Sequence, residues 1–313
     1  MKRKIVSVIT FLLVAIMAFS FIGCDNKKVN IDEFNEFAIN SAKNYYEYFN
    51  NEEQFPSLTI TSKTSQKRGV VRDDNTTTST TDMDFVFQLQ MIDETPVAVI
   101  EITEKTSETV EINVEGQEPS SYTNTTEEKS TYEFNKNEKY FVRKTTNVSN
   151  NVYNQESKEY EKEEKAEKQI MYFENQAEYV LTIIREAESI YGIGEVGYSV
   201  LEQMNTILTE NDLSKTKNTY TLNIEIPFVE IDDESRELRA TRIIYSVKYG
   251  KQGVLDLSSN IISESNNQSM QVGVEMAFEY DADIDKIENE SQGYQEAEID
   301  LSEKLLPDVS MGM

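Results

Sequence analysis

Long stretches of this chain alternate apolar and polar residues with a period of two. The alternation is clearest at 85–91, 220–228 and 270–280. Successive side chains of a β-strand point to opposite faces, so each stretch predicts a strand with one apolar and one polar face. We therefore expect two blocks of antiparallel strands, over 58–148 and over 220–280.

Three other stretches repeat apolar residues every three to four positions, as one face of a helix does. They cover residues 31–49, 174–191 and 196–208. Asn30 precedes the first of them and Glu33 follows three residues later, which is the spacing of a capping box. The pattern predicts an N-terminal helix and a central pair of helices.

The predicted order of elements is a helix, a block of strands, a helix pair and a second block of strands. Strands and helices do not alternate one by one, which argues against a doubly wound parallel sheet. The predicted fold class is α+β: a strongly curved antiparallel sheet, or half-barrel, whose concave apolar face is covered by the N-terminal helix and the central helix pair. The charge run at 154–169 is expected to be a solvated strand end that passes into a helix.

The N-terminus has the plan of a secretory signal. Lys2, Arg3 and Lys4 form a basic head, and an apolar run from Ile5 to Ile22 follows them. A run of this length is also close to what a membrane span needs, so an uncleaved signal anchor is the alternative.

Phe21-Ile22-Gly23-Cys24 ends this run and contains the single cysteine of the chain. These four residues resemble a bacterial lipobox. The resemblance implies that a lipid is attached to the Cys24 thiol and that residues 1–23 are removed as a lipoprotein signal peptide. Residues 24–30 would then be a tether and residues 31–313 a single domain, anchored to the cell membrane by acyl chains and facing outside the cytoplasm.

Composition narrows the classes of function. The chain has no histidine and no tryptophan, and its formal net charge is -27. The lack of histidine excludes a Ser-His-Asp triad and a histidine-bearing zinc site, and the acidity argues against a nucleic-acid partner. We expect a non-enzymatic protein without catalytic residues, cofactor or metal.

Two short motifs are better explained as loops than as sites. The glycine spacing of 192–197 matches a dinucleotide fingerprint, but a helix rather than a strand precedes it. Asp281, Asp283 and Asp285 open like a calcium loop, but Lys286 stands at the position where that loop needs glycine.

The order of elements after the lipobox resembles the half-barrel lipoproteins of the LolA and LppX type. That resemblance implies an apolar cavity between sheet and helices that binds a lipid. Because the resemblance rests on element order, it assigns no functional residue by position.

The alternating runs themselves supply the candidate cavity lining. These residues share the apolar faces of the predicted strands or of the second central helix: Phe85, Phe87, Leu89, Met204, Leu222, Ile224, Met270, Val272, Met276 and Phe278. Flexible methionines among them suit apolar ligands of varied shape. The same residues also fit an ordinary dry core.

Two hypotheses follow. In the first, the anchored domain binds a lipid or another apolar ligand in its cavity. In the second, it is a surface interaction protein with a packed core, and its acidic face meets a partner.

Overall fold

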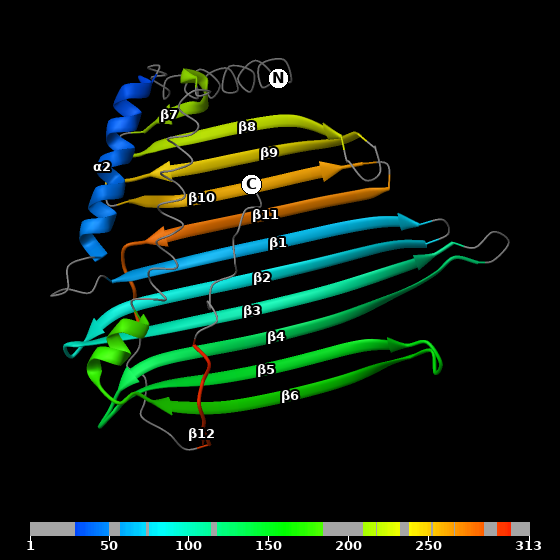
Figure 1. Ribbon diagram of the computed structural model, residues 1–313, viewed down its shortest axis with the longest axis horizontal. Coiled ribbons are helices and arrows are strands. Elements are labelled where there is room, and N and C mark those ends of the chain that lie inside the picture. The colour runs from blue at the N-terminus through cyan, green and yellow to red at the C-terminus, as the bar shows by residue number, and fades with distance from the viewer. Residues whose placement is uncertain are drawn as a thin grey trace, which may run out of the picture.

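A single open sheet of twelve strands dominates the structure (Figure 1). The computed structural model describes residues 29–49, 57–72, 75–113, 118–183, 209–216, 218–231, 238–251, 253–265, 267–284 and 293–301. The strands are β1 (Leu58–Arg72), β2 (Asn75–Ile92), β3 (Thr95–Ile112), β4 (Ser120–Lys136), β5 (Tyr140–Asn154), β6 (Glu159–Tyr172), β7 (Leu213–Lys215), β8 (Tyr220–Ile231), β9 (Leu238–Tyr249), β10 (Val254–Glu264), β11 (Gln268–Glu279) and β12 (Gln295–Glu296). The helix α2 (Ile31–Phe49) precedes them, and the short helix η1 (Glu210–Asp212) precedes β7.

The strand order is β12-β6-β5-β4-β3-β2-β1-β11-β10-β9-β8-β7. Every pairing is antiparallel except the two-residue contact of β12 with β6. Strands β1 to β6 therefore form one meander and β7 to β11 a second. The two meanders are joined where β1 pairs with β11.

The predicted α+β class is wrong, because the described chain is nearly all sheet. The N-terminal helix is confirmed as α2. Of the helix predicted at 174–191, residues 176–183 are helical, while Glu174 and Asn175 form a bend before them. Residues 184–191 and the whole helix predicted at 196–208 lie outside the described residues. Sheet outweighs helix because β1 to β6 are 14 to 18 residues long and continue well beyond their apolar parts.

The core lies at one end of the sheet and mainly on one face, which we call the core face. Cross-strand register aligns its side chains in rows: Ile60 faces Phe87 on one side and Phe278 on the other. All three are at most 4% exposed. Tyr245 and Tyr249 of β9 are buried in the same cluster, and burial raises the pKa of Tyr245 to about 12.

Helix α2 covers the core face across the ends of β8 to β11 (Figure 1). Phe34, fully buried, contacts the rings of Tyr220 and Tyr249. Asn30 caps the helix by accepting a hydrogen bond from the Asp32 backbone N–H at 2.8 Å, so the predicted cap residue is confirmed. In the first turn, Glu33 accepts hydrogen bonds from Lys215 of β7 and Tyr220 of β8, which lower the pKa of its carboxyl.

The helical residues 176–183 cover the core face near the other edge of the sheet. Asn175 precedes them and accepts a hydrogen bond from the Glu178 backbone N–H at 3.0 Å. Tyr179 is fully buried, contacts the rings of Phe134 and Tyr140, and donates its hydroxyl to the Pro96 carbonyl. In the part of the chain that the structure describes, the core face is therefore covered by α2 and by residues 176–183, and the predicted central helix pair is not found.

The opposite face is crossed near the same end by the chain that follows β11. We call residues 281–284 and 293–301 the C-terminal strap. Ala282 and Ile284 pack on Val97, and the Ile284 N–H donates to Gln90 Oε1 at 3.0 Å. This face therefore has a small second cluster of its own.

The strap then reaches the edge strand β6. Tyr294 lies under two cations, with Arg143 at 5.2 Å and Lys168 at 5.6 Å from its ring centre. Farther along, Ile299 is 4% exposed and joins the main core on the core face. The strap thus wraps around β6 from one face of the sheet to the other.

The charge run at 154–169 was predicted as a strand end followed by a helix, and the helix part of that prediction is wrong. Asn154 ends β5, its Oδ1 accepts the backbone N–H groups of Glu156 and Ser157, and the chain returns as β6. Every residue of β6 from Glu159 to Lys168 is exposed. Its outer edge faces solvent, and such edges carry charges to discourage pairing with other chains.

Candidate functional site

The structure brings most of the predicted cavity lining together. Seven of the ten residues belong to the main core cluster and are at most 8% exposed: Phe85, Phe87, Leu89, Leu222, Ile224, Met276 and Phe278. Met270 and Val272 share their face of β11 but are only partly buried. Met204 lies outside the described residues. The seven buried side chains pack against one another, which is the arrangement of an ordinary core.

Beyond the core, the core face remains apolar on one meander only. Register places Ile226, Ile243, Ile261 and Val272 in one row across β8, β9, β10 and β11. All four are partly exposed. This apolar row is the part of the predicted lining that stays accessible at a surface.

On the other meander the sheet continues as a single polar layer. We call residues 63–72, 75–84, 101–112, 120–129, 144–154 and 159–169 the polar half. No residue of these six segments is buried. Both faces of this half therefore meet solvent.

The polar half keeps its strand structure through side chains rather than through a core. It is rich in threonine, whose branched Cβ favours extended backbone. Cross-strand contacts add to this, such as the 2.9 Å hydrogen bond between the Thr109 and Thr123 hydroxyls and the 2.6 Å bond from Ser65 Oγ to Asp82 Oδ1. About ten residues of each strand extend in this way, roughly 34 Å at the usual rise.

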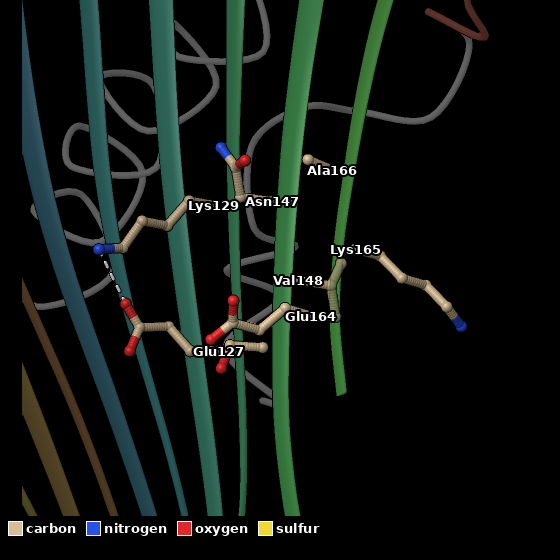
Figure 2. Close-up of a pocket in the computed structure, with 8 residues that line it drawn as sticks. Glu127, Lys129, Asn147, Val148, Glu164, Lys165 and Ala166 are labelled. Atoms are coloured by element: carbon tan, nitrogen blue, oxygen red, sulfur yellow. Dashed lines mark ion pairs between the residues drawn. The ribbon is translucent and has the colours of Figure 1, made fainter. Parts of the chain in front are cut away.

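A shallow hollow of about 340 Å³ lies in the polar half, over β4, β5 and β6 (Figure 2). Its lining residues are Glu127, Lys129, Asn147, Val148, Ser149, Glu164, Lys165 and Ala166. Register places Glu127, Ser149 and Glu164 in one row and Lys129, Asn147 and Ala166 in the next. These rows lie on the face opposite the core face, which we call the outer face.

Both charge signs are present in the hollow. Lys129 Nζ lies 2.9 Å from Glu127 Oε1, and this bond lowers the pKa of Glu127 and raises that of Lys129. Lys165 points away from this pair in Figure 2 and instead lies 2.9 Å from Glu163. The hollow therefore offers hydrogen-bond donors and acceptors in alternation.

Three tyrosines gather where the hollow's strands end. Tyr153 of β5 and Tyr160 of β6 are register partners on the outer face, with ring centres 5.2 Å apart. Tyr122 of β4 stacks on Tyr153 at 5.1 Å and 19°. We call these three residues the tyrosine platform.

Sequence reasoning missed both the hollow and the tyrosine platform. Tyr122, Tyr153 and Tyr160 are polar-patterned positions far from any apolar run. The register of β5 and β6 pairs Tyr153 with Tyr160. The pairing of β4 with β5 ends at Thr125 and Asn151, so the contact of Tyr122 with Tyr153 is seen only in the positions of the two rings. A usable signal was the Asn154–Glu159 turn between two tyrosine-bearing strands, which predicts a hairpin. The charge of the segment led instead to a helix.

Three other predicted features bear on function. Cys24 and the whole leader lie outside the described residues. None of the helices that the structure describes is long and apolar enough to span a membrane. Asp281 binds locally, since its Oδ1 accepts the Ala282 backbone N–H at 2.9 Å, while Asp285 lies outside the described residues.

Comparison with known proteins adds one distant likeness. No protein-family model and no curated protein matches the chain. The translocator domain of the autotransporter NalP from Neisseria meningitidis is a similar solved structure, covering 76% of this chain and 92% of its own at 6% identity and a TM-score of 0.23. A likeness at that score carries no argument about function.

Proposed function

We propose that the protein is a non-enzymatic lipoprotein, anchored to the cell membrane through Cys24 and facing outside the cytoplasm, whose polar half binds a macromolecular partner. The observation that carries the binding role is the polar half itself. A sheet that continues roughly 34 Å past its core, bare on both faces, adds little burial to the fold but a large surface for contact. The packed cluster around Phe87 favours this hypothesis over a ligand cavity in the core.

The position of the anchor fits this role. Helix α2 begins at Ile31, seven residues after Cys24, so the tether spans at most about 25 Å. Glu33 in its first turn contacts β7 and β8, at one edge of the sheet. The hollow lies eight strands away toward the other edge, roughly 40 Å at the usual strand spacing, and at the middle of β4, β5 and β6 rather than at the strand ends that α2 covers. The candidate binding surface is therefore far from the point where the tether joins the fold.

The anchor is tested by the Cys24→Ser variant, expressed in a bacterium that processes lipoproteins. Without the thiol no lipid can be attached, so we expect loss of incorporation of an alkyne-labelled fatty acid and retention of residues 1–23 in the product. Both are measured by in-gel detection and intact-mass spectrometry. Phe21→Leu is the matched control and keeps labelling and cleavage. A Cys24→Ser product that is still cut before residue 24 would contradict the proposal.

A second candidate function, binding of a lipid or other apolar ligand, is favoured by the partly exposed apolar row on the core face. A fluorescent fatty acid titrated into the purified protein tests it. If the row binds the acyl chain, Val272→Asp abolishes saturable uptake because it places a charge in the row. Gln271→Asp, one residue away on the outer face of β11, leaves uptake unchanged. If Val272→Asp leaves the uptake of the fatty acid unchanged, this candidate function is excluded.

A further inference from the structure

We infer that the tyrosine platform and the adjoining hollow form a binding site for a neutral carbohydrate chain. This inference rests on the proposed function and names the partner class for one part of the polar half. The first supporting observation is exposure. Tyr160 is 49% exposed, although a phenol ring usually buries much of its area.

The rings form a surface rather than a cage. Ring centres at 5.1 Å and 5.2 Å are in direct contact, so no ligand fits between them. A cation-binding aromatic cage needs an open space between its rings, which this cluster does not have. A ligand must therefore lie on the outer sides of the rings, as the C–H face of a pyranose does when it meets the negative face of an aromatic ring.

The platform is held in place by hydrogen bonds that leave its phenol protons available. The Thr123 backbone N–H donates to Tyr160 Oη at 3.1 Å, and Gln155 Nε2 donates to Tyr122 Oη at 3.2 Å. Both phenol oxygens accept in these contacts. Each keeps its own proton for an acceptor such as a sugar hydroxyl.

The hollow continues the platform along β5. On the outer face, Tyr153 is followed by Asn151, Ser149 and Asn147 at every second residue. Six residues of extended strand span roughly 20 Å, which is longer than one monosaccharide. The site therefore suits a chain of several sugar units.

The chemistry along this path suits hydroxyl groups. Glu127 and Glu164 accept, Lys129 donates, and the Asn147 amide does both. Between the hollow and the platform, Asn151 adds a further amide to the outer face of β5.

The negative charge of the protein favours a neutral carbohydrate chain over an anionic one. The protein carries a formal net charge of -27, and beside the platform Glu156 of the turn with Glu159 and Glu161 of β6 outnumber Lys158 and Lys162. Such a field repels phosphate, sulfate and carboxylate groups. The core of a protein–protein interface is depleted in charged residues, whereas four of the eight residues that line the hollow are charged.

The test uses the full-length lipidated protein in a detergent without a sugar headgroup, titrated with cellohexaose and with chitohexaose by calorimetry. We expect saturable binding of at least one hexasaccharide with a Kd below about 1 mM. Tyr153→Ala and Tyr160→Ala each lower the affinity at least tenfold. Tyr160→Phe keeps the ring but loses the hydroxyl, so it lowers the affinity less than Tyr160→Ala does.

Tyr172→Ala is the matched control, because Tyr172 is also an exposed tyrosine of β6 but lies at the core end of the strand. It changes affinity less than twofold. Saturation-transfer NMR on the parent protein independently shows whether tyrosine ring protons contact the sugar. Circular dichroism confirms that each variant is folded.

The inference is overturned if neither hexasaccharide binds. It is also overturned if Tyr153→Ala and Tyr160→Ala leave the affinity unchanged, or if the same tyrosines are found to bind a protein. The last two results would leave the polar half as a binding surface. Failure of the proposed function is seen separately, in the Cys24→Ser experiment.

Discussion

Replacing Phe87 with alanine is expected to lower the free energy of unfolding by about 3–5 kcal/mol. Phe87 is fully buried and pairs across the strands with Ile60 and Ile100, at the centre of the core face. Removing the Phe87 ring leaves a cavity between the rows of core side chains, and the neighbouring strands cannot close this cavity. Urea unfolding followed by circular dichroism measures the loss.

Thr80→Val is the matched control in the same strand. Thr80 lies in the polar half, and the replacement keeps the branched Cβ and the volume of the side chain. We expect a change below about 0.5 kcal/mol. Equal losses for the two variants would show that stability is spread along β2 instead of concentrated at its core end.

Removing three charges from the edge strand is expected to convert the protein into concentration-dependent assemblies. The variant is Glu163→Val, Glu164→Val and Lys165→Val in β6. The outer edge of β6 is exposed up to Lys168, and its charges oppose the docking of another strand. Three β-branched apolar residues make this edge a template for pairing. Size-exclusion chromatography with light scattering measures the mass.

The sequence Glu-Glu-Lys occurs again at 127–129, within the interior strand β4. The same three substitutions there remove identical charges from a strand whose two edges are already paired with β3 and β5. This control is expected to assemble much less than the β6 variant. If the β4 and β6 variants assemble to a similar extent, the assembly is caused by the lost charge alone.

The strands with apolar alternation were predictable from the sequence, because burial of one face forces a period of two. Phe85, Phe87 and Leu89 face the core as their pattern indicates. The polar half was harder, since neither face of it is buried and no period results. β6 is the extreme case: its glutamates and lysines suit a helix equally well, and pairing with β5 decides its structure.

The candidate site was likewise predictable only in its apolar part. Shared burial revealed the core residues around Met276 and Phe278, but it could not distinguish a dry core from a cavity. In the tyrosine platform, Tyr153 meets Tyr160 through the register of β5 and β6, and register depends on turn geometry such as the Asn154 turn. A pattern read along one strand contains no information about which residue lies opposite.

The pairing of β1 with β11 has a consequence for how the chain folds. Thr59 pairs with Glu279, so this contact closes a loop of more than two hundred residues, and such distant contacts form slowly. Because the chain is made from its N-terminus, β2 to β6 can assemble on β1 first, while the other side of β1 stays unpaired until β11 has been made. The yield of native protein is therefore expected to depend on this side of β1 staying unpaired until β11 arrives.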